Sequence, residues 1–549
     1  MKLERVLKLR FLLGSWLLFI GSSLLAQPYV SKVWVADNGD GTYKNPVLMA
    51  DYSDPDAIRV GDDYYLVSST FTCTPGLPIL HSKDLVNWTI VNYALKKQVP
   101  EDVYATTRHG KGVWAPAIRY HKGEFYIYYP DPDYGIYMIK TKNPAGEWSA
   151  PVQVIGGKGL IDPCPLWDDN GNAYLANGWA GSRAGVNSIL TIFRMNEDGT
   201  KTIDDGRIVY DGHELNHTIE GPKLYKRNGY YYIFAPAGGV TGGWQLVLRS
   251  KDIYGPYEEK IVMDQGTTDI NGPHQGAWVD TQTGEDWFLH FQDKGAYGRV
   301  THLQPMKWLN NWPVIGIDKD GDGKGEPVLS YQKPNVKKVF PICTPAESDE
   351  FNSDTLGLQW EWNANPKVTW MSLIRGKGYL RMYSVKVPEN FTNFWDVPNL
   401  LLQKFPALDF AVTTKLRLTA MPLTTGEGCK TGLIIMGRDY SYLSFERTGN
   451  DYKLSQVTCM NADTKGAESV VSVANINVNE VYLRVKVSSP DAMCTFSYST
   501  DGVNFMPFGK EFKARVGGWI GAKVGVFCTS TFNNTQWACA DFDWFRVDK

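Results

Sequence analysis

The sequence has no excess of charge of one sign, and its few histidines and cysteines are not clustered. The formal net charge is −3, with 8 His and 8 Cys among 549 residues. We find no basic stripe suited to nucleic-acid phosphates and no Cys/His spacing typical of a zinc site. The sequence therefore offers no support for nucleic-acid binding or for a zinc-organised fold.

The cysteines are also too scattered to form a disulfide framework. We expect most of them to be buried thiols. The two pairings to test first are Cys429 with Cys459 and Cys528 with Cys539.

Long apolar runs are scarce. The one candidate, Phe11–Leu25, follows a basic start and is followed by Ala26 and Gln27 at a plausible cleavage site without Cys, which argues against a lipid anchor. It is short for a membrane span, and no later segment reaches about 18 uninterrupted apolar residues. We predict a cleaved signal peptide over residues 1–26, export to the periplasm or outside the cell, and no stable membrane insertion. A retained N-terminal anchor is the alternative.

Aromatic residues and glycine are abundant, with 19 Trp, 30 Tyr and 53 Gly. One core rarely serves more than about 300 residues, so at least two domains are expected. Between residues 50 and 300, a unit of apolar strand, turn and aromatic strand recurs, with turn glycines at Gly61, Gly123, Gly171, Gly229 and Gly284. Five such units predict a five-bladed β-propeller over residues 27–330, with a β-sandwich of similar hairpins as the alternative.

One position recurs in the same register of every unit. Four residues before the apolar residue that precedes each turn lie Asp54, Trp114, Asp162, Glu220 and His274. The innermost strands of a propeller line its axis, so these side chains should converge on one funnel. Any single Asp-Pro would be an ordinary turn signal, but three acids at one register are harder to explain as turns.

Such a trio has the residue types needed to cut a glycosidic bond. One carboxyl protonates the leaving oxygen, while another activates water or attacks the sugar. A nearby carboxylate raises the pKa of the acid by like-charge repulsion. Binding of a central metal and capping of strand ends are the alternatives. The carboxyl separations are not encoded in the pattern, so inverting and retaining chemistry both stay open at this point.

The pattern changes after about residue 330. A basic, Pro-containing linker over 331–348 precedes alternating strands over 349–549, which predict a two-sheet β-sandwich and an all-β fold class. Just before the linker, the run that starts at Asp318 resembles an EF-hand loop, but its twelfth position is Leu329 instead of Glu. We interpret this run as an acidic turn.

Ordered motifs run along residues 45–549. They are Asn45-Pro46-Val47, Asp54-Pro55-Asp56, Val113-Trp114-Ala115-Pro116, Ile161-Asp162-Pro163, Glu220-Gly221-Pro222, Tyr297-Gly298-Arg299-Val300, Leu358-Gln359-Trp360-Glu361-Trp362-Asn363 and Asp541-Phe542-Asp543-Trp544-Phe545. In these motifs the chain resembles glycoside hydrolase family 43, the inverting β-xylosidases and α-L-arabinofuranosidases whose propeller is followed by a concanavalin-like sandwich. One departure is Ser53, where the family often has Pro.

The resemblance implies a role for each acid of the trio. Asp54 would be the general base, Glu220 the general acid, and Asp162 would raise the pKa of Glu220 and orient it. The enzyme would be exo-acting, would release terminal β-D-xylose or α-L-arabinofuranose from plant hemicellulose or pectin, and would need no cofactor for the chemistry.

The resemblance also implies contacts around the trio. Trp114 would wall the sugar pocket, Arg299 would contact sugar hydroxyls, and the segment at Phe71 would shape the pocket. His274 would hold a water or a calcium ion on the axis. A structural calcium in the sandwich would use Glu350 with Asp541 or Asp543. A sandwich loop would narrow the active site, but no residue is assigned to it.

Several alternatives remain. A retaining fructan-cleaving propeller is disfavoured because its Arg-Asp-Pro and Glu-Cys motifs are absent, and a non-catalytic carbohydrate-binding propeller because all three acids are present. An endo-arabinanase of the same family needs an open groove, against which the large sandwich argues. Xylose and arabinofuranose stay close to even, and no oligomeric state is assigned.

Overall fold

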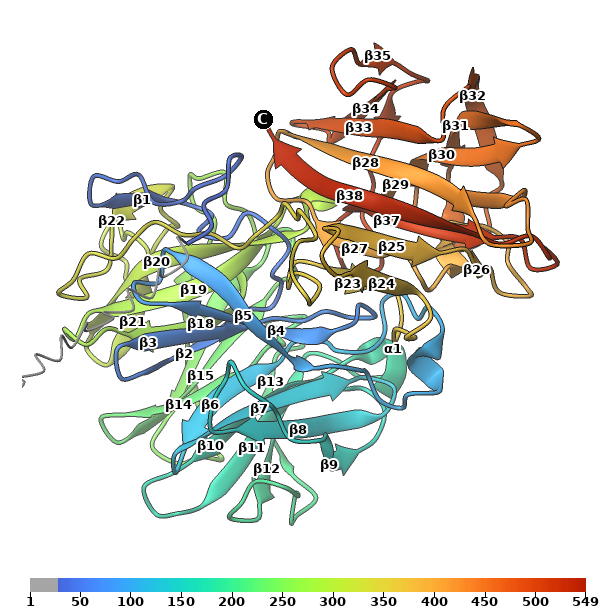
Figure 1. The fold of residues 1–549 in the computed structure, drawn as a ribbon. Helices are drawn as coiled ribbons and strands as arrows, with labels where there is room; N and C mark the ends of the chain where they lie inside the picture. Colours follow the sequence, from blue (N-terminus) through green and yellow to red (C-terminus); the bar gives the residue numbers. More distant parts are fainter. Residues whose placement is uncertain (1–27) are drawn as a thin grey trace, which may run out of the picture.

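The computed structural model describes residues 28–549, so the signal peptide predicted over residues 1–26 lies outside the described residues. The described chain forms two β domains, a propeller and a sandwich (Figure 1). Within this part, no helix has the length and apolar character needed to cross a membrane.

Five four-stranded antiparallel sheets form the propeller, as predicted, and each is a simple meander of consecutive strands. The strands, blade by blade, are β2 Asp56–Val60, β3 Asp63–Val67, β4 Gly76–Ser82 and β5 Trp88–Leu95; β6 Ala117–His121, β7 Glu124–Asp131, β8 Gly135–Thr141 and β9 Val152–Gly156; β10 Leu160–Trp167, β11 Ala173–Trp179, β12 Ile189–Met195 and β13 Arg207–Asp211; β14 Lys223–Arg227, β15 Tyr230–Ala237, β16 Trp244–Ser250 and β17 Glu258–Met263; β18 His274–Asp280, β19 Asp286–Asp293, β20 Arg299–Leu309 and β21 Trp312–Ile315.

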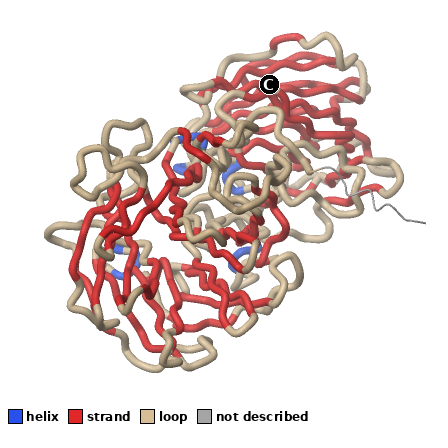
Figure 2. Tube along the Cα trace, turned by 90° about the vertical axis from the view of Figure 1, so that its left-hand side faces the viewer, coloured by secondary structure: helices blue, strands red, loops and turns tan. Residues whose placement is uncertain are grey.

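The recurring turn has a simple physical basis. In the first blade Val60 pairs with Asp63 across a tight turn that contains Gly61, and Gly61 has a φ of 65°, which glycine adopts without steric cost. The last blade closes against the first, because β18 lies beside β2. Figure 2 shows the propeller strands arranged around a common centre.

The C-terminal domain is a sandwich of two eight-stranded sheets. The first sheet contains β23 Glu361–Trp362, β27 Leu401–Lys404, β37 Lys523–Ser530, β29 Cys429–Met436, β30 Tyr440–Thr448, β31 Asp451–Cys459 and β32 Glu468–Ile476, with β26 Val385–Lys386 beside β37. The second sheet contains β24 Met371–Ile374, β25 Tyr379–Tyr383, β38 Ala538–Asp548, β28 Phe410–Ala420, β33 Glu480–Ser488, β34 Met493–Ser499 and β35 Met506–Pro507, with β36 Phe512–Lys513 beside β34.

Alternation of side chains builds the core of the sandwich. Along β33 the residues Val481, Leu483, Val485 and Val487 are buried between the sheets, while their neighbours point outward. The remaining short elements are β1 Thr42–Lys44, β22 Ser330–Gln332, α1 Gly181–Ala184, η1 Val103–Ala105, η2 Gly295–Tyr297, η3 Phe394–Asp396 and η4 Ala462–Thr464.

The segment that joins the domains is well anchored. Strand β22 pairs with β1 as far as Gln332, so the extended connection starts two residues later than the predicted linker. The backbone amide of Thr344 donates to the carbonyl of Tyr29 at 2.9 Å, which ties the connection to the start of the described chain.

Neither of the two cysteine pairs named for testing forms a disulfide. All eight cysteines are free, and seven of them are buried, as expected for core thiols. Cys429 faces the core between the two sheets, whereas Cys459 belongs to a cluster on the opposite face of its sheet. Two side chains on opposite faces of a sheet cannot form a disulfide.

Candidate active site

The backbone that carries the acidic residues is strained. Asp54 and Asp162 have φ angles of 54° and 53°, which non-glycine residues rarely adopt. In β10 the pairing with β11 shifts register between Ile161 and Cys164, and β18 shifts in the same way directly after His274. Bulges and strained residues of this kind re-aim side chains and gather at functional sites.

The carboxylate of Asp54 meets hydrogen-bond donors on both oxygens. The hydroxyls of Ser69 and Ser53 donate to Oδ2 at 2.6 and 3.0 Å. The guanidinium of Arg299 donates to Oδ1 at 3.4 Å. These three donors hold the side chain of Asp54 in place.

Asp162 is buried and accepts two hydrogen bonds at one oxygen. The backbone amide of Gly221 donates at 2.7 Å and the amide of Gln275 at 3.1 Å. Burial raises the pKa of Asp162 to about 6, against the Gly221 bond, and the charge of Asp54 adds to the rise. The Gly221 bond also fixes the residue that follows Glu220 in the chain.

Glu220 lies where a protonated carboxyl is favoured. Burial of the carboxyl and the negative charges of Asp162 and Asp54 raise the pKa of Glu220 to about 8, against the opposing charge of Arg299. A third of its side chain stays accessible from the funnel. The structure therefore brings the three predicted acids close enough for the charges of Asp54 and Asp162 to raise the pKa of Glu220.

His274 lies beside Glu220 in a fully buried position. Its Nε2 is 3.3 Å from Oε1 of Glu220, without hydrogen-bond geometry. Burial and the charge of Arg299 lower the pKa of His274 to about 3, so the ring is neutral. Neither ring nitrogen has a partner among the described residues, which leaves them available for the axial water or ion implied by the resemblance.

Aromatic and cationic side chains surround Trp114, the residue expected to wall the sugar pocket. The indole of Trp114 donates to the carbonyl of Gly110 at 3.1 Å. Phe71 lies 6.1 Å from Trp114 between ring centroids, and the guanidinium of Arg183, from α1, lies 5.1 Å above the Trp114 ring. Arg183 was not identified from the sequence.

A loop of the sandwich reaches this wall. The ring of Trp519 lies 6.0 Å from that of Trp114 and 5.6 Å from the guanidinium of Arg299. A hollow of about 170 Å³ opens beside Arg299 and Trp519. Trp519 thus lies beside two of the predicted site residues, and it was not identified from the sequence. Its flanking glycines mark a turn, but nothing in the pattern shows that this turn faces the propeller.

Asp51 joins this loop to the propeller. Its buried carboxylate accepts from the backbone amide of Arg299 at 2.9 Å and from that of Gly521 at 2.8 Å. One side chain therefore positions both Arg299 and the end of the loop that carries Trp519. Asp51 was also missed from the sequence.

The calcium site expected in the sandwich is not supported. Arg546 donates to both oxygens of Glu350, at 2.7 and 2.8 Å, and Arg381 to both oxygens of Asp541, at 2.7 and 2.9 Å. Both carboxylates are thus engaged in bidentate ion pairs, and among the described residues neither they nor Asp543 belong to a group of three potential metal ligands.

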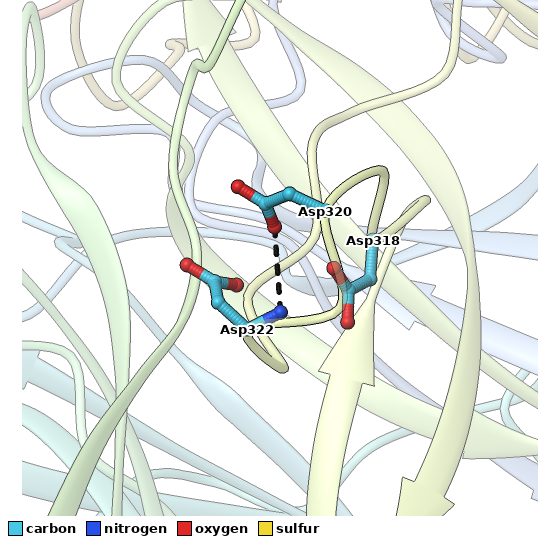
Figure 3. Close-up of side chains that lie close together, drawn as sticks. All are labelled: Asp318, Asp320 and Asp322. Atoms are coloured by element: carbon cyan, nitrogen blue, oxygen red, sulfur yellow. Dashed lines mark hydrogen bonds between the residues drawn. The ribbon is translucent and has the colours of Figure 1, made fainter.

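The run from Asp318 forms an exposed acidic turn, as predicted. The carboxylate oxygens of Asp318, Asp320 and Asp322 lie within 4.8 Å of one another (Figure 3). The backbone amides of Gly321 and Gly323 donate to Asp318 at 2.7 and 2.9 Å, so the carboxylate stabilises the turn itself.

Comparison with known proteins agrees with this geometry. The family model described as Glycosyl hydrolases family 43 matches residues 43–313, and that of the beta xylosidase C-terminal Concanavalin A-like domain matches residues 348–548. A putative beta-xylosidase of Xylanibacter ruminicola is 38% identical over 507 residues, which cover 91% of this chain and 88% of the relative. A non-reducing end alpha-L-arabinofuranosidase of Bacteroides ovatus is 29% identical, covering 92% and 94%. The crystal structure of a GH43 protein from Bacillus licheniformis matches with a TM-score of 0.78 at 28% identity, covering 92% of this chain and 99% of that one.

Proposed function

Because the chain belongs to glycosyl hydrolase family 43 and is therefore a glycosidase, we propose that it releases terminal pentoses from plant hemicellulose or pectin by an inverting, exo-acting mechanism. β-D-Xylose and α-L-arabinofuranose are both proposed substrates, since the relatives include enzymes named for each. No cofactor takes part in the proposed chemistry.

The contrasting surroundings of two carboxyls carry this proposal, because Glu220 is buried beside negative charges whereas Asp54 accepts from three donors. Glu220, with its pKa raised to about 8, holds a proton at neutral pH and can give it to the leaving oxygen. Asp54, surrounded by donors, is the proposed base that takes a proton from the attacking water. Asp162 keeps the proton on Glu220 through its charge.

The walls of the site support exo action. Trp114 and Trp519 approach each other from different domains, and Arg299 lies between Asp54 and Trp519. We propose that these side chains close one end of the site, so that it accepts one terminal sugar, whereas cleavage within a chain needs an open groove. The guanidinium of Arg299 has donors suited to neighbouring sugar hydroxyls.

Two matched substrates test the reaction. Wild type should hydrolyse 4-nitrophenyl β-D-xylopyranoside, 4-nitrophenyl α-L-arabinofuranoside or both, and NMR of the first product should show the inverted anomer. In Glu220→Gln, turnover of a pentose disaccharide should fall by about 10² to 10⁴-fold, because its leaving group needs the proton. Nitrophenyl pentosides, with a better leaving group, should lose less.

The contrary outcomes are equally clear. Wild type that cleaves neither pentoside would refute the pentosidase proposal. Equal disaccharide turnover in Glu220→Gln would refute the role of the acid, and a retained anomer would refute inversion. We also propose that residues 1–26 direct export, which N-terminal sequencing of the secreted protein tests by a start at Gln27.

A further inference from the structure

The outer face of the first sandwich sheet is only partly covered. Along β29 the side chains of Leu433 and Ile435 enter the core, while Ile434 and Met436 face outward. The segment 387–400, which contains η3, covers this outer face and packs Phe394 against it. Beside the segment lies a hollow of about 190 Å³, where β26 meets the end of β37 and the start of β29.

Aromatic rings and two opposite charges line this hollow. Phe532 is 41% exposed, and Phe391 packs edge-on against Phe394 with 6.2 Å between ring centroids. Lys430 lines the hollow, and its ammonium has no hydrogen bond or ion pair within the described part of the chain. Glu468 accepts from the hydroxyls of Tyr440 and Tyr442 at Oε1, at 2.7 and 3.2 Å, so Oε2 stays available.

This combination suits a neutral ring rich in hydroxyls. The C–H face of a sugar stacks on an aromatic ring, while its hydroxyls accept from an ammonium and donate to a carboxylate. A purely apolar occupant would bury the ammonium of Lys430 without a partner and leave Oε2 of Glu468 unbonded, at a cost in free energy. The volume is below the ~300–1,000 Å³ of pockets for drug-sized ligands, which suits one sugar ring.

The same covering segment touches the rim of the active site. Trp395, next to Phe394, stacks on His109 with 3.6 Å between ring centroids, and its carbonyl accepts from Nε2 of His109 at 2.8 Å. His109 precedes Gly110, whose carbonyl accepts from Trp114. In Figure 1, β26 lies on the side of the sandwich that faces the propeller.

We propose that this hollow is a second saccharide-binding site, which holds one sugar unit of the polymeric substrate away from the bond that is cut. The inference rests on the proposed function for the identity of its ligand. It assigns to the sandwich a binding role that is additional to the wall contributed by Trp519.

Binding to a non-hydrolysing full-length chain tests the proposal. In a Glu220→Gln background, isothermal titration with xylohexaose and with linear arabinohexaose should show two sites per chain for at least one of them. Added Phe532→Ala or Lys430→Ala should weaken the second site about tenfold or abolish it. Trp537→Ala removes an aromatic ring that is 52% exposed but does not line the hollow, and should leave both sites intact.

Activity separates this inference from the proposed function. In the otherwise wild-type chain, Phe532→Ala should leave kcat/KM for the nitrophenyl pentosides unchanged and lower kcat/KM for the polymer severalfold. One site per chain for both hexasaccharides, or two sites that Phe532→Ala and Lys430→Ala leave unaltered, would overturn the inference while pentoside hydrolysis still stood. Two sites in a chain that hydrolyses no pentoside would refute the proposed function and leave the second site standing.

Discussion

At the residue scale, the proton on Glu220 sets the upper pH limit of the proposed reaction. Its pKa is raised to about 8 by burial and by the charges of Asp162 and Asp54. Asp162→Asn removes one of these charges, so the pKa of Glu220 should fall and the acid should lose its proton at lower pH. The alkaline limb of the kcat/KM profile should move down by roughly one pH unit.

A neighbouring change separates this effect from general damage. Ser69→Ala removes a hydrogen bond to Asp54 and leaves the Asp162 charge in place. It should lower the rate without moving the alkaline limb. If Asp162→Asn lowered kcat/KM at every pH but left the alkaline limb of the pH profile where it is in wild type, Asp162 would act only by positioning Glu220.

The same carboxyl has a signature in stability. A folded-state pKa above the unfolded value means that the folded chain holds the proton more tightly, so stability falls as pH rises from about 4.5 to about 8. Glu220→Gln cannot ionise and should escape this loss. Its thermal midpoint should exceed that of wild type at pH 8 and match it near pH 4. The surface change Glu511→Gln should show no such pH-dependent difference, and a constant offset for Glu220→Gln would contradict the raised pKa.

The register of the acids was predictable, but their surroundings were not. Asp54, Asp162 and Glu220 occupy equivalent places in repeats, and a repeat turns sequence spacing into spatial position. Ser69 reaches Asp54, and Gln275 reaches Asp162, because of local backbone geometry such as the positive φ of Gln275. No residue pattern in the sequence predicts these contacts.

At the element scale, a loop from one domain completes a site in the other. The loop 516–521 carries Trp519, and Asp51 fixes it by accepting from the amides of Gly521 and Arg299. Asp51→Asn keeps the size and shape of the side chain but replaces one acceptor oxygen with an NH₂ group. One of the two buried backbone amides then has no acceptor. We expect a loss of about 1–3 kcal/mol in the free energy of unfolding and a raised KM.

Trp519→Ala is the matched comparison for this element. It removes the aromatic ring but keeps the hydrogen bond from Gly521 to Asp51, so KM for pentosides should rise. The denaturant midpoint should change little, since half of the Trp519 side chain is already exposed. Urea unfolding and steady-state kinetics measure both quantities. If the two variants behaved alike, Asp51 would have no special role as an anchor.

Strands and turns could be predicted where a sequence pattern repeats, whereas contacts that occur once in the molecule could not. Gly turns and alternating strands predicted the blades and the sandwich, because local sterics and one buried face determine them. The pairing of Cys429 with Cys459 failed because a buried strand with apolar residues on both faces does not reveal which face is which. The position of Trp519 depends on how the two domains dock, and domain docking produces no repeating pattern in the sequence.

At the scale of the whole molecule, the sandwich holds the Phe71 segment of the propeller in place. Thr74, close behind Phe71, exchanges backbone hydrogen bonds with Trp362 at 3.0 and 2.7 Å. The side chain of Asn365 accepts from the backbone amide of Gln98 at 2.8 Å, and the side-chain amide of Gln98 donates to the carbonyl of Phe71 at 2.6 Å. The Phe71 segment is therefore held from both sides of the domain junction, and the two domains should unfold in one calorimetric transition.

A buried charge cluster at this junction permits a direct test. Glu361 bonds Lys404 and Lys523, all within the sandwich, and accepts from the hydroxyl of Tyr93 in the propeller at 3.2 Å. Although burial acts to raise it, the two ammonium groups lower the pKa of Glu361 to about 2. A lowered carboxyl pKa contributes stability above about pH 4.5 that is lost as pH falls toward 2.

Glu361→Ala would leave two buried ammonium groups without their partner, which costs about 3–5 kcal/mol. We expect a lower unfolding free energy at pH 7, a smaller difference from wild type near pH 3, and reduced activity because the Phe71 segment is loosened. Differential scanning calorimetry across this pH range measures the first two. Lys97→Ala breaks an exposed pair with Glu101 and should change little. If Glu361→Ala split the transition while pentoside turnover stayed at the wild-type value, the junction would be a structural link that the active site does not need.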